Sequence, residues 1–89
     1  MEINSTRGQE WLSFAMRVAD HIENYTVKQY GDKPDDQIEN WTPEQCVMQI
    51  GKYVARFGSN QRGEEEKTLD MKKIAHYAQL VHSKLMNGG

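Results

Sequence analysis

The chain has 89 residues, a single cysteine and a formal net charge of −2. This length predicts one domain near the lower size limit for a self-sufficient core, and one cysteine excludes an internal disulfide framework. The charge gives no general attraction to nucleic acid or to an anionic membrane, and no apolar run approaches the ~20 residues of a membrane span. With no basic start followed by an apolar segment, we expect a cytoplasmic domain over residues 1–89 without a membrane partner.

Residues 6–28 are predicted to form the first helix. Apolar residues recur there at three- and four-residue spacing and make one stripe: Trp11, Phe14, Ala15, Val18, Ile22 and Tyr25. Leu12 and Met16 lie away from this stripe. Gly31 and Pro34 break the pattern, so residues 31–40 are predicted to form a polar loop.

Residues 43–57 are predicted to form the second helix, which has the clearest start signal in the chain. Thr42 is the expected N-cap, Pro43 the first helical residue, and Gln45 completes a capping box. The expected core face follows from the spacing of Val47, Ile50, Tyr53, Val54 and Phe57.

Residues 65–86 are predicted to form the third helix, with glutamates in its first turn, where the helix dipole favours negative charge. Its apolar residues have heptad-like spacing and are expected to face the core: Met71, Ile74, Ala78, Val81 and Leu85. Leu69 and Leu80 lie away from that row.

Three amphipathic helices with short connections predict an all-α fold, either a small three-helix bundle or an open helical array. Four apolar residues have no partner inside three such helices: Leu12, Met16, Leu69 and Leu80. We therefore expect the domain to form a homo-oligomer, specifically a dimer.

Asp70 is the unusual residue, because it falls roughly 40° from the centre of the third helix's apolar row. A carboxylate there must be paired, hydrogen-bonded or bound to a metal ion, since burying a lone charge is costly. Three interpretations stay open: an ion pair with Arg56 of the preceding helix, a magnesium half-site shared with Glu66 one turn earlier, or a solvated carboxylate. Magnesium is often held by one or two carboxylates together with water and a substrate phosphate.

The segments "YTVKQYGD", "KYVAR" and "LDMKKIAHYAQL", with the acidic run between the last two, resemble the MazG-like group of small phage and bacterial helical domains over residues 22–82. The resemblance implies an all-α oligomer that cleaves nucleoside triphosphates to monophosphate and pyrophosphate with magnesium. It also implies site residues: Glu65, Glu66 and Asp70 as metal ligands, and Lys52 and Arg56 as phosphate contacts. Lys73, at the edge of the same carboxylates, is a further candidate for nucleotide binding.

The chain departs from the group's pattern at one point. The group has a cluster of glutamates on an earlier helix, and the nearest match here, Asp20 and Glu23, lies on the face opposite the predicted core. One carboxylate pair holds hydrated magnesium weakly and cannot build a two-metal clamp. The first hypothesis is therefore a catalytically silent or weakly active relative, and whether the chain is an enzyme stays open. The alternatives are a magnesium-dependent nucleoside triphosphate pyrophosphohydrolase and a phage-type nucleic-acid accessory or interaction protein.

Overall fold

The computed structural model describes residues 1–32, 39–59 and 63–88, which form helices and short connections without a β-strand. This confirms the predicted all-α class. The chain divides into two compact units, Met1–Lys33 and Pro34–Gly89. The expectation of a single domain over residues 1–89 stays a prediction.

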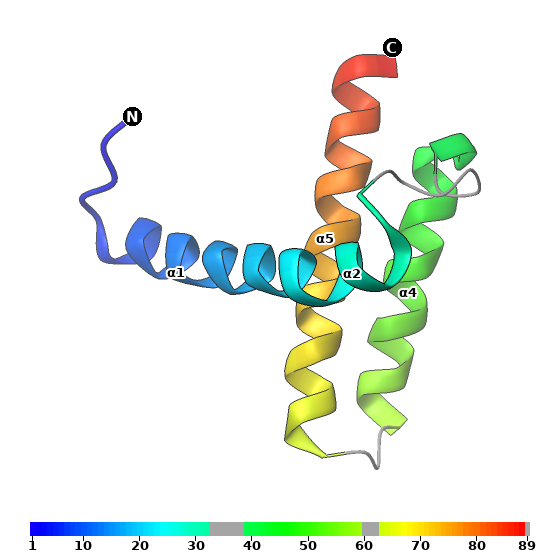
Figure 1. Ribbon diagram of the computed structural model, residues 1–89, viewed down its shortest axis with the longest axis horizontal. Helices are drawn as coiled ribbons and strands as arrows, with labels where there is room; N and C mark the ends of the chain where they lie inside the picture. The colour runs from blue at the N-terminus through cyan, green and yellow to red at the C-terminus, as the bar shows by residue number, and fades with distance from the viewer. Residues whose placement is uncertain (33–38, 60–62, 89) are drawn as a thin grey trace. The chain divides into compact units, whose positions relative to one another are not determined.

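The first unit is helical from Thr6 to Tyr30. α1 (Thr6–His21), η1 (Ile22–Thr26) and α2 (Val27–Tyr30) follow one another without a break (Figure 1, blue to cyan). Ser5 caps the start, because its hydroxyl accepts a hydrogen bond from the Gly8 N–H at 3.0 Å. At the other end Gly31 has a φ of 87°, a conformation that favours glycine and stops the helix.

The π-helical turn η1 was not predicted. Its wider hydrogen-bond spacing is seen where the Val27 N–H donates to the carbonyl of Ile22, five residues earlier. The side-chain amide of Asn24 donates to the Asp20 carbonyl oxygen at 3.2 Å and to Asp20 Oδ1 at 2.7 Å. The first of these bonds satisfies a backbone acceptor beside the widened turn.

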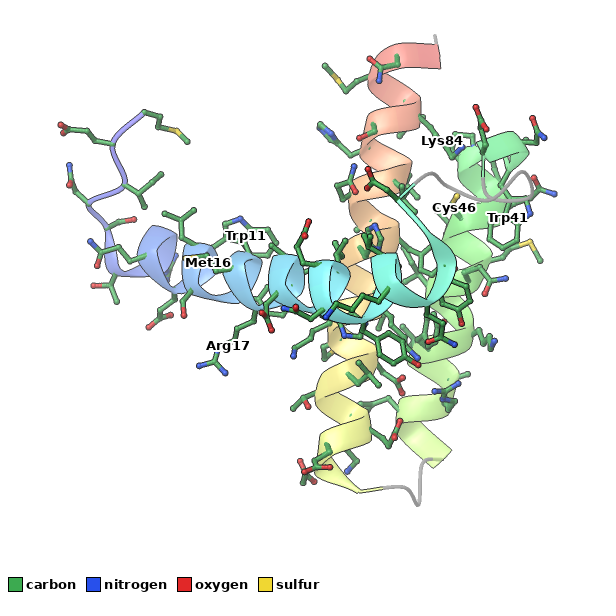
Figure 2. The ribbon with its side chains drawn as sticks, viewed as in Figure 1. Trp11, Met16, Arg17, Trp41, Cys46 and Lys84 are labelled. Atoms are coloured by element: carbon green, nitrogen blue, oxygen red, sulfur yellow. The ribbon has the colours of Figure 1, made fainter. Side chains whose placement is uncertain are left out.

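No residue of α1, η1 or α2 is buried. Trp11, Met16 and Arg17 all extend from α1 (Figure 2). Trp11 is 61% exposed and packs its ring against Phe14 with the centroids 5.5 Å apart, while Met16 is 73% exposed. Trp11 and Tyr25 of the predicted stripe are therefore exposed, as are Leu12 and Met16 outside it. The other members of the stripe are half-buried: Phe14, Ala15, Val18 and Ile22.

The second unit is a helical hairpin in which α4 (Pro43–Ser59) and α5 (Glu64–Gly88) lie side by side and antiparallel (Figure 1, green and yellow to red). The capping box of α4 is confirmed: the Gln45 N–H donates to Thr42 Oγ1 at 3.2 Å, and the Thr42 N–H donates to Gln45 Oε1 at 2.7 Å. The predicted ranges 43–57 and 65–86 agree with the observed helices to within two residues at each end.

Fewer residues are buried between α4 and α5 than the apolar periodicity of the two helices predicted. Cys46 and Tyr53 are the buried apolar residues of the described hairpin, and Asp70 is buried beside them. The prediction that the full apolar row of each helix faces the core is wrong, since Ala78 is exposed and so are five larger members: Val47, Val54, Phe57, Met71 and Leu85.

Helix geometry explains this difference. A residue one position later is rotated by about 100°, so Val54 and Met71 point well away from the directions of Tyr53 and Asp70, which meet the opposite helix. Both helices are right-handed and run in opposite directions. This rotation therefore places the exposed apolar residues of α4 and those of α5 on the same side of the hairpin. We call the five exposed residues Val47, Val54, Phe57, Met71 and Leu85 the apolar face.

Candidate functional site

Asp70 and Arg56 form an ion pair between the two helices of the hairpin. Arg56 Nη2 donates a hydrogen bond to Asp70 Oδ1 at 3.1 Å, and the Asp70 side chain is completely buried while that of Arg56 is 28% exposed. Of the three interpretations of Asp70, the ion pair is confirmed and the solvated carboxylate is wrong. Asp70 is buried because α5 turns it, rather than its apolar row, towards α4.

The pair leaves two buried polar atoms without a hydrogen bond, Arg56 Nε and Asp70 Oδ2. A guanidinium and a carboxylate can form two parallel bonds, but here only one of them is made. An unsatisfied buried polar atom costs about 1–3 kcal/mol, so the pair is weaker than the two-bond arrangement that its chemistry allows.

The three predicted metal ligands occupy different environments. Asp70 is buried, Glu66 is half-buried one turn earlier with an interaction of its own, and Glu65 is exposed. Within residues 1–32, 39–59 and 63–88, no three His, Cys, Asp or Glu side chains gather in a way that could hold a metal ion. A two-carboxylate magnesium half-site of Glu66 and Asp70 stays a prediction.

The three predicted phosphate contacts come together around one aromatic ring. Lys52 Nζ, Arg56 Cζ and Lys73 Nζ lie 5.6, 5.4 and 5.5 Å from the centroid of the Tyr53 ring. Because all three cations lie within 5.6 Å of the same point, any two of them are separated by at most twice that distance. The hairpin thus brings a lysine of α5 to the two basic residues of α4, and we call Lys52, Arg56 and Lys73 the basic cluster.

The charges of the basic cluster are incompletely balanced. Arg56 is paired with Asp70, whereas neither Lys52 nor Lys73 makes an ion pair or hydrogen bond to a described residue. Each cation–π contact contributes about 0.5–2 kcal/mol. Among the described residues, Arg56 therefore has a carboxylate partner, and the two lysines have their contacts with the Tyr53 ring.

An aromatic row extends from the basic cluster along the hairpin. The Tyr53 and Tyr77 rings are 6.1 Å apart and tilted, and Tyr77 stacks with Trp41 at 6.5 Å. Trp41 also lines an open groove of about 620 Å³, beside which Lys84 Nζ donates to the Glu39 carbonyl oxygen at 3.1 Å. Figure 2 shows Trp41 and Lys84 towards the same end of the hairpin. Sequence reasoning missed this groove, because its walls come from segments about 40 residues apart.

Comparisons with protein-family models, with curated proteins and with solved structures find no match to this chain. The resemblance to the MazG-like group therefore rests on the sequence motifs. None of the helices in the described parts of the chain is long and apolar enough to span a membrane.

Proposed function

We propose that this chain is a self-associating all-α interaction module, a catalytically silent relative of the MazG-like group. The observation that carries the proposal is the apolar face of the α4–α5 hairpin. Its members range from 37% exposed at Met71 to 63% exposed at Leu85. Several large apolar side chains exposed on one side of a hairpin indicate an interaction surface.

The buried apolar residues alone are too few to hold the hairpin together. Burying one large apolar side chain contributes about 1.5–3 kcal/mol, whereas ordering each residue of the backbone costs about 1–2 kcal/mol. Cys46 and Tyr53 are the only described apolar residues that are buried. Covering the apolar face would supply the missing stabilisation.

A second copy of the chain suits this face in size and geometry. With 17 residues in α4 and 25 in α5, the shared length of the hairpin is about 25 Å and its width about 20 Å, a footprint of roughly 500 Å² per copy. Two copies together reach about 1,000 Å², which is about the minimum area for a specific interface. The alternation of three- and four-residue spacing on α5 suits helix packing near +20°, so two hairpins face to face make a four-helix bundle.

The Arg56–Asp70 pair supports the absence of catalysis in this proposal. The carboxylate that the resemblance assigns to a metal is committed to a guanidinium inside the hairpin. The matching acids of the first unit, Asp20 and Glu23, are exposed, and Asp20 accepts a hydrogen bond from Asn24. Magnesium catalysis of triphosphate cleavage would need these groups to act as ligands instead.

Sedimentation equilibrium across micromolar to millimolar concentrations tests the proposal. The wild-type chain should be a dimer, and Val54→Glu should shift it to monomer because a charge enters the apolar face. Met48→Glu is the matched control, because Met48 is an exposed apolar residue of the same helix outside that face. A wild-type monomer at every concentration overturns self-association. The apolar face would then be covered by the first helix of the same chain or by another protein.

The catalytic alternative is tested separately by pyrophosphate release from nucleoside triphosphates with magnesium. The silent module should release none above the rate of a blank. Release that needs both magnesium and Asp70 would replace this proposal with a pyrophosphohydrolase.

A further inference from the structure

We infer that pH controls the self-association of this chain through His82, a histidine on the side of α5 that belongs to the apolar face. The inference rests on the proposed function, because it concerns the surface by which two copies are proposed to meet. It adds a titratable group to that surface, and it gives the direction in which pH changes the assembly.

The position of His82 follows from the spacing of exposed residues along α5. Four of them recur on one side of the helix: Met71, Ala78, His82 and Leu85. His82 follows Ala78 by four residues and precedes Leu85 by three, the two spacings that make side chains neighbours on a helix surface. It comes eleven residues, about three turns, after Met71, so the two side chains differ in direction by about 20°. His82 therefore lies within the part of the apolar face that α5 provides.

The His82 side chain is exposed, and it makes no hydrogen bond, ion pair or ring contact with another described residue. The positions of α5 one turn away, 78, 79, 85 and 86, hold no charged residue. The charge of the imidazole is thus not fixed by a partner on its own helix.

Two acidic residues come from the segment packed against this end of α5. Counting twelve residues along each antiparallel helix from the ion pair of the hairpin places Glu44 of α4 at the level of His82. Glu39 contributes its carbonyl oxygen to Lys84 Nζ at 3.1 Å. Both carboxylates are exposed, and neither makes an ion pair with a described residue. Negative charge at this end favours a protonated His82 in the separate chain.

Covering the apolar face has the opposite effect on His82. Burying an imidazolium among apolar side chains costs far more than burying the neutral ring. A histidine ordinarily takes up a proton as the pH falls through about 6.5. Association therefore favours the neutral form and releases protons, so the two copies should hold together above this pH and separate below it.

Sedimentation equilibrium of the full chain at pH 7.5, 6.5 and 5.5 tests the inference. At pH 5.5 the protonated form of an ordinary histidine is about ten times as abundant as the neutral form, and each of two chains loses this factor. The dissociation constant of the dimer should therefore rise by about 10- to 100-fold between pH 7.5 and 5.5. His82→Gln stays neutral, so its dissociation constant should change by less than about twofold.

His76→Gln is the matched control, because His76 is a histidine of the same helix that points about 120° away from His82. This variant should keep the pH response of the wild type. Circular dichroism of all samples reports helix content, since acid unfolding would also separate two copies.

Several results would overturn the inference while leaving self-association intact. They are a dimer whose dissociation constant does not depend on pH, a dimer that tightens in acid, and a pH response that persists in His82→Gln. Loss of the helical signal at pH 5.5 in all three chains would also overturn it, because unfolding would then cause the separation. A wild-type monomer at pH 7.5 overturns the proposed function itself, and the inference with it, so the two failures are distinguishable.

Discussion

Arg56 and Asp70, fourteen residues apart in the sequence, meet across the hairpin with Nη2 and Oδ1 3.1 Å apart and with Asp70 completely buried. The pair fixes the register between α4 and α5 near their connection. The carboxylate that the resemblance assigns to a metal ion is thus the one that holds an arginine of the basic cluster.

Asp70→Asn should lower the free energy of unfolding by about 2–4 kcal/mol, because a neutral amide leaves the largely buried guanidinium without its counter-charge. Urea denaturation with and without magnesium measures this, and magnesium should make no difference. Glu64→Gln is the control: its pair with Lys67 is at the surface, and its loss should cost less than about 0.5 kcal/mol. A neutral or stabilising Asp70→Asn would favour the carboxylate half-site, where two acids repel each other.

Thr42→Ala should destabilise the fold by about 0.5–2 kcal/mol, because the hydroxyl that accepts the Gln45 N–H is lost at the start of α4. Thr42→Ser keeps the acceptor and should stay close to wild type. Thermal melts of the two variants, followed by helical circular dichroism, give the comparison. An alanine variant as stable as the serine variant would show that this cap contributes nothing.

Two glycines of the hairpin should respond to alanine with opposite signs. Gly51 lies inside α4 with open space where a Cβ would lie, so Gly51→Ala should stabilise by about 0.5–1 kcal/mol. Gly63 has a φ of 94°, so Gly63→Ala should destabilise by about 1–2 kcal/mol. Chemical denaturation of both variants checks the pair, and equal signs would contradict the backbone conformation at Gly63.

Cys46→Ala should destabilise by about 1–2 kcal/mol, because a fully buried sulfur leaves a small cavity between the helices. Met48→Ala, at an exposed position of the same helix, should change stability by less than about 0.5 kcal/mol. Denaturant midpoints at equal protein concentration measure both. If the two substitutions had equal effects, Cys46 would not be at the centre of the packing.

The helix ends and the ion pair could be predicted from the sequence because their causes are local or simple. Thr42, Pro43 and Gln45 specify a helix start through neighbouring atoms, and the structure confirms it. Asp70 on an apolar side needs a partner, and Arg56 was one of the few bases within reach.

The orientation of the helices about their own axes could not be predicted. Apolar residues cover a wide arc of α4, so periodicity shows that the helix is amphipathic but not which part of the arc meets α5. The gathering of Lys52 and Lys73 at Tyr53 depends on that orientation, since the two lysines are 21 positions apart in the chain. Their identity as phosphate contacts stays a prediction.

The π turn Ile22–Thr26 has a consequence for chain length. It holds one more residue than an α-helical turn would, while the helix continues on both sides from Thr6 to Tyr30. A one-residue deletion within it would restore a regular helix and rotate Val27–Tyr30 by about 100° relative to α1, without opening a gap in the backbone. At this turn, an insertion or deletion of one residue would therefore change the direction in which the side chains of Val27–Tyr30 point relative to α1, and it would leave the helix unbroken.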